Sequence, residues 1–344
     1  MRNAVQFAIV LASCVASTPA AAWGPKGHEY SGGIADQLLS AKAKVEVQTI
    51  LGTPLRNAAT WADCVKDVSG PPNYRYTSNP RYHAPCIDFE TAAGIARMES
   101  YVRRNWENCT RSPGEDVCHK GYHYADVAIQ HDHYDRAYAG TSDHDLVSAI
   151  NAAVAVLRGD PAPAPFNIRD KQEALLMLAH FMGDLHQPLH VGAVYLDAND
   201  KSIDPDTPGH QHDHSIETRG GNSIDVGSSN LHSDWDGVLA SLDPAHIEPQ
   251  VIARAKALAK TEGPEAMWVE TWASDTVKAS QNAYSGISYT HPGTKGKWAA
   301  QFDDRKKYSG MKRLLQDQQL VKAGVRLTEL LNLVWQSRSG ARRL

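Results

Sequence analysis

The sequence predicts an all-α protein, built as a single mainly helical domain over residues 23–344. Two observations lead to this prediction. Apolar residues return at helical spacing in six long segments, whereas runs that alternate apolar and polar residues are rare. The composition agrees, because 42% hydrophobic and 22% charged residues with ordinary glycine and proline contents exclude disordered, collagen-like and coiled-coil chains.

Residues 1–22 have the pattern of a secretory signal peptide. Arg2 precedes a mostly apolar run over Ala4–Val15, and three alanines end at Ala22. The run is shorter than the roughly 20 apolar residues of a membrane helix. We therefore expect cleavage between Ala22 and Trp23 and a secreted or periplasmic protein. A Leu-Ala-Ser-Cys segment ending at Cys14 leaves a lipoprotein signal open as the alternative.

The helical segments follow in order along the chain. They cover residues 34–51, 144–158, 171–186, 247–260, 267–283 and 311–335. Thr141, Ser142 and Asp143 offer capping groups before the second segment. Pro188 stops the third, because proline cannot continue a helix. Residues 122–129 form the best of the weak strand candidates, and residues 70–85, 159–165 and 197–229 are expected to be loops.

Four cysteines remain after residue 22: Cys64, Cys86, Cys109 and Cys118. An even number in an exported chain predicts two disulfides, with three possible pairings that the sequence does not separate. They would staple an extended loop region before residue 120. A thiolate metal site is the alternative, but the chain has no Cys-x-x-Cys pair.

Histidine is the unusual part of the composition, with 16 residues. His180 and Asp184 are four residues apart, so both side chains project from one face of a predicted helix and can bind one divalent ion. Their neighbours are apolar, which turns this polar face inward, where an unpaired aspartate would be costly. His190 follows just beyond Pro188, ready to bind a neighbouring ion.

His232 and Asp236 repeat the same spacing, and three further segments offer ligands. Asp63 lies in a Thr-Trp-Ala-Asp segment, and His123 lies between two tyrosines. His28 ends a Trp-Gly-Pro-Lys-Gly-His segment at the expected mature N-terminus. A free α-amino group, with a pKa of about 7.7–8.0, is partly deprotonated at neutral pH and can bind zinc.

These segments, in this order, resemble the trinuclear zinc nucleases typified by fungal nucleases S-one and P-one and plant nuclease I, which are relatives of bacterial zinc phospholipase C. The central segment, His-Phe-Met-Gly-Asp-Leu-His-Gln-Pro-Leu-His, and the later Asn-Leu-His-Ser-Asp-Trp-Asp carry most of the resemblance. It extends from Trp23 to about Trp335. The resemblance implies the helical fold of the phospholipase C and nuclease P-one type.

The resemblance also implies nine ligand residues for three Zn²⁺ ions. One ion would be bound by Asp63, His123, His180 and Asp184. A second would be bound by His28 and by Trp23, through its amino nitrogen and carbonyl oxygen, with Asp184 bridging the two ions. The third would be bound by His190, His232 and Asp236. The interval between Asp63 and His123 is longer than the family pattern, so His83 stays open as the alternative to His123.

The implied activity is hydrolysis of single-stranded RNA and DNA to 5′-mononucleotides, with release of phosphate from 3′-nucleotides. The net charge of −4 excludes a broad basic nucleic-acid surface. Three zinc ions against three ligand carboxylates would instead leave about +3 in the pocket. Zinc lowers the pKa of bound water toward about 7, and Asp63 would accept its proton. Tyr124, by family position, would stack on a base.

Two other functions remain open: a zinc phospholipase C acting on phospholipid head groups, and a non-enzymatic zinc-binding or storage protein. Asp236, where a glutamate would otherwise stand, resembles the nuclease branch. We expect a monomer without stable membrane association.

The remaining histidines are expected to be surface or capping residues (His131, His133, His144), solvated loop residues (His210, His212, His214), a packing or hydrogen-bonding residue (His186), or residues without a functional signal (His119, His246, His291).

Overall fold

The computed structural model describes residues 23–80, 83–112, 114–209, 213–291, 293 and 297–336. Helices dominate these residues, which confirms the predicted mainly helical class. The helices of eight or more residues are α1 (Pro25–Leu38), α2 (Ala41–Leu51), α6 (Ala92–Arg104), α8 (Leu146–Arg158), α9 (Lys171–Asp184), α12 (Pro249–Ala257), α13 (Trp268–Ala283) and α14 (Arg305–Gln336).

Helix α9 lies at the centre of the fold. Its residues are buried from Glu173 to Asp184. It packs against α8, α14, α1 and the short helix α4 (Trp61–Cys64). Asp170 caps its N-terminus by accepting a hydrogen bond from the backbone N–H of Glu173 at 2.9 Å. This helix therefore carries His180 and Asp184 into the interior of the protein.

The predicted helix over residues 34–51 is wrong as a single helix. The chain leaves α1 after Leu38, and Ser40 starts α2 by accepting a hydrogen bond from the backbone N–H of Ala43 at 3.2 Å. The apolar stripe spans both helices, so periodicity alone did not reveal the break. Helix α1 begins at Pro25, where a proline lacking an N–H is well tolerated.

Other boundaries also differ from the predictions. Helix α8 is capped by Asp145, which accepts from the backbone N–H of Ser148 at 2.9 Å, rather than by the residues upstream. Pro188 does more than stop α9, because it is the first residue of the short helix α10 (Pro188–Val191). Helix α14 begins at Arg305, six residues before the predicted start.

The region before residue 120 contains two disulfides, as predicted, and the structure selects one pairing. The bonds join Cys64 to Cys86 and Cys109 to Cys118. The prediction of an extended loop here is wrong in part, because α6 lies between them. The shorter helices α3 (Leu55–Ala58), α5 (His83–Cys86) and α7 (Cys118–Gly121) also lie in or near this region.

Strands are few and short, but the predicted 197–229 loop contains several of them. The largest sheet has the order β6-β5-β8-β7. Its strands are β5 (Ile224–Val226), β6 (Ser229–Asn230), β7 (Ile287–Thr290) and β8 (Trp298–Phe302), and the pair β3 (Tyr195–Leu196) and β4 (Ser202–Ile203) lies apart from it. A third pair, β1 (Val127–Ala128) with β2 (Gly192–Ala193), replaces the candidate strand over 122–129.

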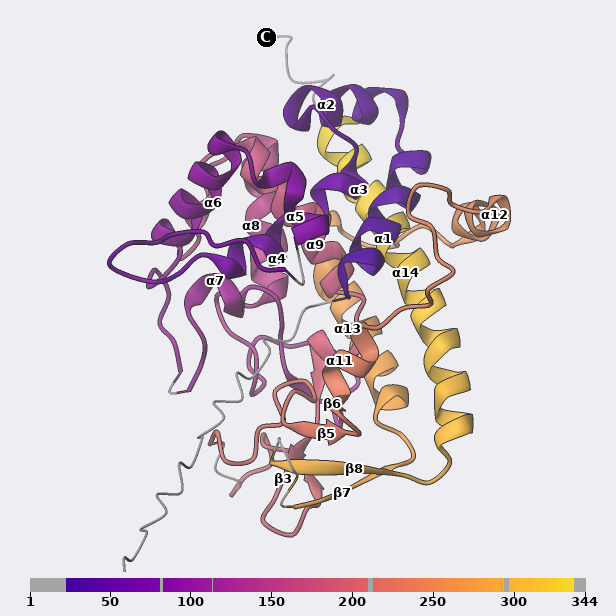
Figure 1. Cartoon of the computed structure of the whole chain (residues 1–344). Coiled ribbons are helices and arrows are strands. Elements are labelled where there is room, and N and C mark those ends of the chain that lie inside the picture. The colour runs from indigo at the N-terminus through magenta and orange to yellow at the C-terminus, as the bar shows by residue number, and fades with distance from the viewer. Residues whose placement is uncertain are drawn as a thin grey trace, which may run out of the picture.

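Figure 1 shows the small sheet at one end of the molecule and α14 running from that end to α2 at the other. Short helix α11 (Leu231–Asp236) lies between the sheet and the helical part. Within the described ranges, no helix combines the length and the apolar character needed to cross a membrane. The sheet and the helices therefore meet around α9, α10 and α11.

Candidate metal centre

Eight of the predicted site residues meet at the inner ends of these elements. They are His28 of α1, Asp63 of α4, His123 just after α7, His180 and Asp184 of α9, His190 of α10, and His232 and Asp236 of α11. All eight are buried, and none is more than 8% exposed. Strand β1 pairs with β2 just beyond the cluster, and the backbone N–H of Ala125 donates to the carbonyl of His190 at 2.7 Å, which holds the His123 and His190 segments together.

Asp184 lies at the middle of the first part of the cluster. Its Oδ1 is 3.4 Å from His28 Nε2, and its Oδ2 is 2.9 Å from His123 Nδ1 and 3.2 Å from His180 Nε2. Asp63 approaches the same region, with Oδ1 3.7 Å from His180 Nε2. One carboxylate thus faces imidazoles from three separate elements.

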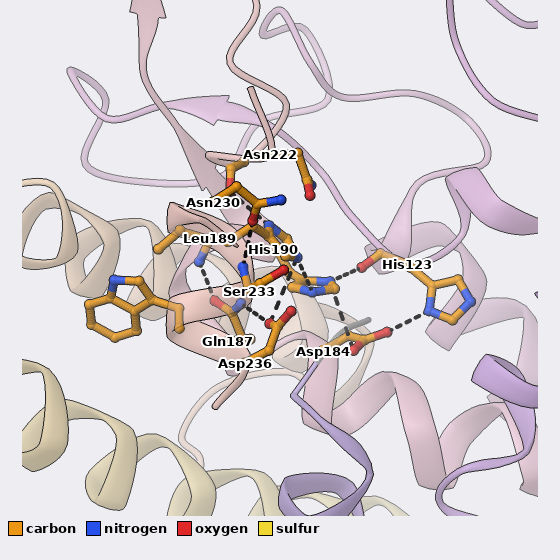
Figure 2. Close-up of polar contacts among 12 residues, drawn as sticks. His123, Asp184, Gln187, Leu189, His190, Asn222, Asn230, Ser233 and Asp236 are labelled. Atoms are coloured by element: carbon orange, nitrogen blue, oxygen red, sulfur yellow. Dashed lines mark hydrogen bonds and ion pairs between the residues drawn. The ribbon is translucent and has the colours of Figure 1, made fainter. Parts of the chain in front are cut away.

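His190 and Asp236, both labelled in Figure 2, form the second part of the cluster together with His232. The Nδ1 of His190 is 2.6 Å from the carbonyl of His123, and the Nδ1 of His232 is 2.7 Å from the carbonyl of Gly220. A carbonyl oxygen can only accept, so each Nδ1 carries the proton and each neutral ring has a bare Nε2.

The two bare Nε2 atoms of His190 and His232 are 3.1 Å apart. Neither can donate a proton to the other when both rings are neutral, so their lone pairs face each other. A cation between them removes this repulsion. Asp236 Oδ1, 3.8 Å from His232 Nε2, adds a carboxylate to the pair. The donor set of two imidazoles and a carboxylate suits Zn²⁺.

Unsatisfied atoms support the same interpretation across the whole cluster. The following buried atoms have no hydrogen-bond partner among the described residues: His28 Nε2, Asp63 Oδ2, His123 Nε2, His180 Nε2, Asp184 Oδ1 and Asp236 Oδ2. Buried polar atoms in proteins are normally paired, and each unpaired one requires an explanation. Metal ions explain the group, because all of these atoms are imidazole nitrogens or carboxylate oxygens.

The pKa shifts of His123, His232 and Asp184 favour the protonation states that metal binding requires. Burial lowers the pKa of His180, but Asp184 and Asp63 outweigh it and raise the pKa, which a bound cation would oppose. Burial lowers the pKa of both His123 and His232 to about 3, which keeps these rings neutral. Burial raises the pKa of Asp184, but His180 and His190 outweigh it and hold the pKa well below the usual range. Burial, together with the charge of the other two carboxylates, raises the pKa of Asp236 well above it. A bound cation would oppose that rise.

Lys66 belongs to the site although the sequence did not reveal it. Its Nζ is 2.7 Å from Asp63 Oδ1, and its side chain is 13% exposed. Burial raises the pKa of Asp63, but Lys66 and then His180 outweigh it, so the pKa falls below its usual value. The signal was the spacing of three residues, which places two side chains on neighbouring positions of one helical turn.

Trp23 is fully buried beside the cluster. The backbone N–H of Gly24 donates to the carbonyl of Asp236 at 2.9 Å, and Gly27 is so close to Trp23 that an added Cβ would lie 2.9 Å from the Trp23 Cβ. The chain from residue 23 to His28 therefore runs past both parts of the cluster. The expected signal peptide and Cys14 lie outside the described residues.

His123 and His83 occupy different places in the structure. His123 faces Asp184 inside the cluster, whereas the His83 side chain is 51% exposed and lies 2.9 Å from Glu90. Tyr124 follows His123 and is partly exposed. No ring of the described residues stacks on Tyr124 in the structure, and its role as a base platform stays a prediction.

The prediction that His144 is a surface or capping residue is wrong. His144 is 1% exposed, with Nε2 2.7 Å from Glu115 and Nδ1 2.6 Å from Asp143. The other histidines of the described ranges lie outside the cluster. His119 is buried, whereas His133, His246 and His291 are exposed. The remaining three have a polar neighbour: His131 lies 2.8 Å from Asp206, His186 lies 2.7 Å from the Met182 carbonyl, and His214 lies 2.7 Å from Glu217. His210 and His212 lie outside the described residues.

Comparison with known proteins identifies a matching family and several relatives of this chain. A family model described as S1/P1 Nuclease matches residues 23–336. Endonuclease 2 of Arabidopsis thaliana is 25% identical over 332 residues, which cover 91% of this chain and 90% of that protein. Nuclease S1 of Aspergillus oryzae is 27% identical over 224 residues, which cover 62% of this chain and 53% of that protein. The chain therefore belongs to the S1/P1 nuclease family, whose members are hydrolases of ester bonds in nucleic acids.

Proposed function

We propose that this protein is a secreted zinc-dependent nuclease with three Zn²⁺ ions. It hydrolyses single-stranded RNA and DNA to 5′-mononucleotides and releases phosphate from 3′-nucleotides. The observation that carries the proposal is the buried cluster of eight ligand-type side chains, above all the two bare imidazole nitrogens 3.1 Å apart. The family supplies the substrate class, and the geometry of the cluster supports the metal requirement.

The ligand assignment has three parts. Asp63, His123, His180 and Asp184 hold one ion; Trp23 and His28 hold a second, with Asp184 bridging the two; and His190, His232 and Asp236 hold the third. The spacing of the ligand atoms supports two of these sets, because the ligand atoms of His123, His180 and Asp184 lie within 4.8 Å of one another, as do those of His190, His232 and Asp236. His28 lies within the same distance of Asp63 and His180, beside the first set. The Asp184 position between three imidazoles favours its role as the bridge.

Asp63 is the proton acceptor of the proposed reaction. When bound, zinc supplies a water whose pKa is lowered toward neutrality. Asp63 is ionised because Lys66 and His180 lower its pKa, and its Oδ2 has no hydrogen-bond partner among the described residues. Lys66 holds Oδ1 at 2.7 Å and so orients the carboxylate. Oδ2, the oxygen that Lys66 does not hold, would then take the proton of the attacking water as the water oxygen bonds to phosphorus and the 3′-oxygen leaves.

The substrate is expected to be single-stranded because a duplex does not easily present a bare phosphate to a buried cluster. Tyr124 is our candidate to stack on an unpaired base, and its partial exposure directly after His123 supports this role. Stacking of this kind contributes about 1–3 kcal/mol per base and tolerates any base.

The mature protein is proposed to be one domain over residues 23–344, cleaved after Ala22, monomeric and without stable membrane association. The family match that begins at Trp23 favours this start. The same match, with relatives named as nucleases, favours the nuclease over phospholipase C and over a zinc-storage protein.

The test is an assay of the purified mature protein against single-stranded RNA, single-stranded DNA, duplex DNA, a 3′-nucleotide and phosphatidylcholine, with its zinc content measured in parallel. We expect three zinc ions, cleavage of both single strands, slower cleavage of the duplex and phosphate release from the 3′-nucleotide. A His180→Ala variant controls for contaminating nucleases. Cleavage of lipid without nucleic acid, or activity that survives strong chelators, would contradict the proposal.

A further inference from the structure

Gln187 connects the two short helices that carry His190, His232 and Asp236. It is fully buried and precedes α10. Its Oε1 accepts a hydrogen bond from the backbone N–H of Leu189 at 2.5 Å, and its Nε2 donates to Asp236 Oδ1 at 2.8 Å (Figure 2). One amide therefore contacts both α10 and the last residue of α11.

The direction of these two bonds is set by their partners. A backbone N–H only donates, so the amide oxygen of Gln187 must face Leu189. The amide nitrogen then has to face Asp236, whose Oδ1 must accept. This occupies one oxygen of the carboxylate, and Oδ2 is left without a hydrogen-bond partner among the described residues. The carboxylate is thus held in one orientation with one oxygen available.

The same amide also bears on the position of His190. Helix α10 is only four residues long, so its cap accounts for much of its local order. Ser280 of α13 holds the other side by donating to the carbonyl of Pro188 at 2.6 Å. His190 is the third residue of this helix, and its ring is oriented by the His123 carbonyl. Loss of the cap therefore moves a ligand backbone as well as releasing Asp236.

We propose that Gln187 is a positioning residue that couples His190 to Asp236 and so sets the affinity of the third metal site. The proposal rests on the proposed function, because it takes these residues as zinc ligands. Partners that orient metal ligands typically contribute about 10–100-fold to metal affinity. We expect a loss of that size for one of the three ions, with the other two unaffected.

Three variants test this coupling by zinc titration and by zinc content after dialysis against a weak chelator. Gln187→Met removes both hydrogen bonds. Gln187→Glu keeps an acceptor for the N–H of Leu189 but removes the donor to Asp236. Asn230→Asp is the matched control, because Asn230 also caps a short helix of the site, accepting from the N–H of Ser233 at 2.7 Å, and gains the same charge.

We expect two tightly held ions in both Gln187 variants and three in the wild type and in Asn230→Asp. Three ions held as tightly in Gln187→Glu as in the wild type would overturn the coupling, even if Gln187→Met fails to fold. Equal loss in Asn230→Asp would also overturn it, since added charge would then be the cause. A wild-type protein with fewer than three ions would overturn the proposed function itself, and the inference with it.

Discussion

At the residue scale, the ring nitrogen that carries the proton in each histidine decides which nitrogen can bind a metal ion. The carbonyls of Ala59, His123 and Gly220 lie 2.6–2.7 Å from the Nδ1 atoms of His180, His190 and His232. Each ring therefore presents a bare Nε2 to the interior. Backbone carbonyls are part of every chain, so this selection depends on where the backbone passes rather than on which residues precede each histidine.

Asp63→Asn tests the proton acceptor at this scale. The amide keeps the shape of the side chain but cannot take a proton, and it is a poorer zinc ligand. We expect the rate of single-strand cleavage to fall by about 10²–10⁴-fold. The control is Asp67→Asn, one helical turn further on, where the carboxylate accepts from Asn79 at 3.3 Å and lies outside the cluster. Activity within twofold of the wild type in Asp63→Asn would contradict the assigned role.

Addition of one residue before Trp23 tests the proposed terminal ligand. The free amine becomes a peptide nitrogen, which cannot chelate zinc in the same way. We expect one zinc ion to bind more weakly and the activity to fall, measured by zinc titration and by single-strand cleavage. Removal of the extra residue by a protease should restore both. If the extended protein keeps its zinc and its activity, Trp23 is not a ligand.

At the scale of elements, the site depends on short helices whose ends are capped by polar side chains. Helix α10 has four residues and α11 has six, too few for a periodic apolar pattern to stand out. Their existence depends on the caps Gln187 and Asn230 and on packing against longer neighbours. Sequence periodicity therefore located α8, α9 and α13 well, but it missed α10 and joined α1 to α2. A helical turn at α11 was indicated only by the spacing of His232 and Asp236.

The N-terminus of α8 carries a prediction about pH. Burial lowers the pKa of His144, but hydrogen bonds to Glu115 and Asp143 outweigh it, so the pKa is raised. A raised folded pKa means that the stabilising contribution is fully present below the ordinary value of about 6.5. It is lost as the pH rises through the folded pKa.

We therefore expect His144→Gln to destabilise the protein more at pH 5.5 than at pH 9, by about 1–3 kcal/mol at the lower pH. Denaturant unfolding at several pH values measures this difference, with the half-exposed His133→Gln as the control. A stability gap that does not change with pH would show that His144 acts only through packing.

At the scale of the whole molecule, the cluster ties together residues that are far apart in the chain. The eight side chains come from residues 28 to 236. Helices α1, α4, α9, α10 and α11 carry seven of them, and His123 follows α7. Ions bound here would link α10, which packs on α13, and α11, which packs on the sheet, to α1, α4 and α9 of the helical part. The zinc-free chain would in turn hold a buried group of carboxylates and bare nitrogens facing one another.

Chelation should therefore lower the stability of the entire protein. Each ion contributes about 2.7 kcal/mol when its free concentration is a hundredfold above its Kd. Three ions then correspond to a fall in the melting temperature of roughly 12 °C after zinc removal. Calorimetry with and without a strong chelator measures it. Zinc added back should restore the transition, whereas magnesium should not. An unchanged melting temperature would show that the ions do not support the fold.

The sequence by itself determined the helical class, the two disulfides and the residues that meet in the cluster. Helical periodicity, an even cysteine count and the His-x-x-x-Asp spacing of His180 with Asp184 and of His232 with Asp236 are local features, legible within short segments. The resemblance to the nuclease family supplied the other members of the cluster. His123 could be preferred over His83 only by its neighbours in the chain, and the structure places just one of them against Asp184.

Only the tertiary structure decided the disulfide pairing, the contact of His144 with Glu115 and the bridge made by Gln187. Each depends on groups that approach across the fold or on which nitrogen of a ring carries a proton. Such contacts follow from the packing of distant segments, which also brings backbone carbonyls next to the histidine rings. No pattern along the chain predicts them.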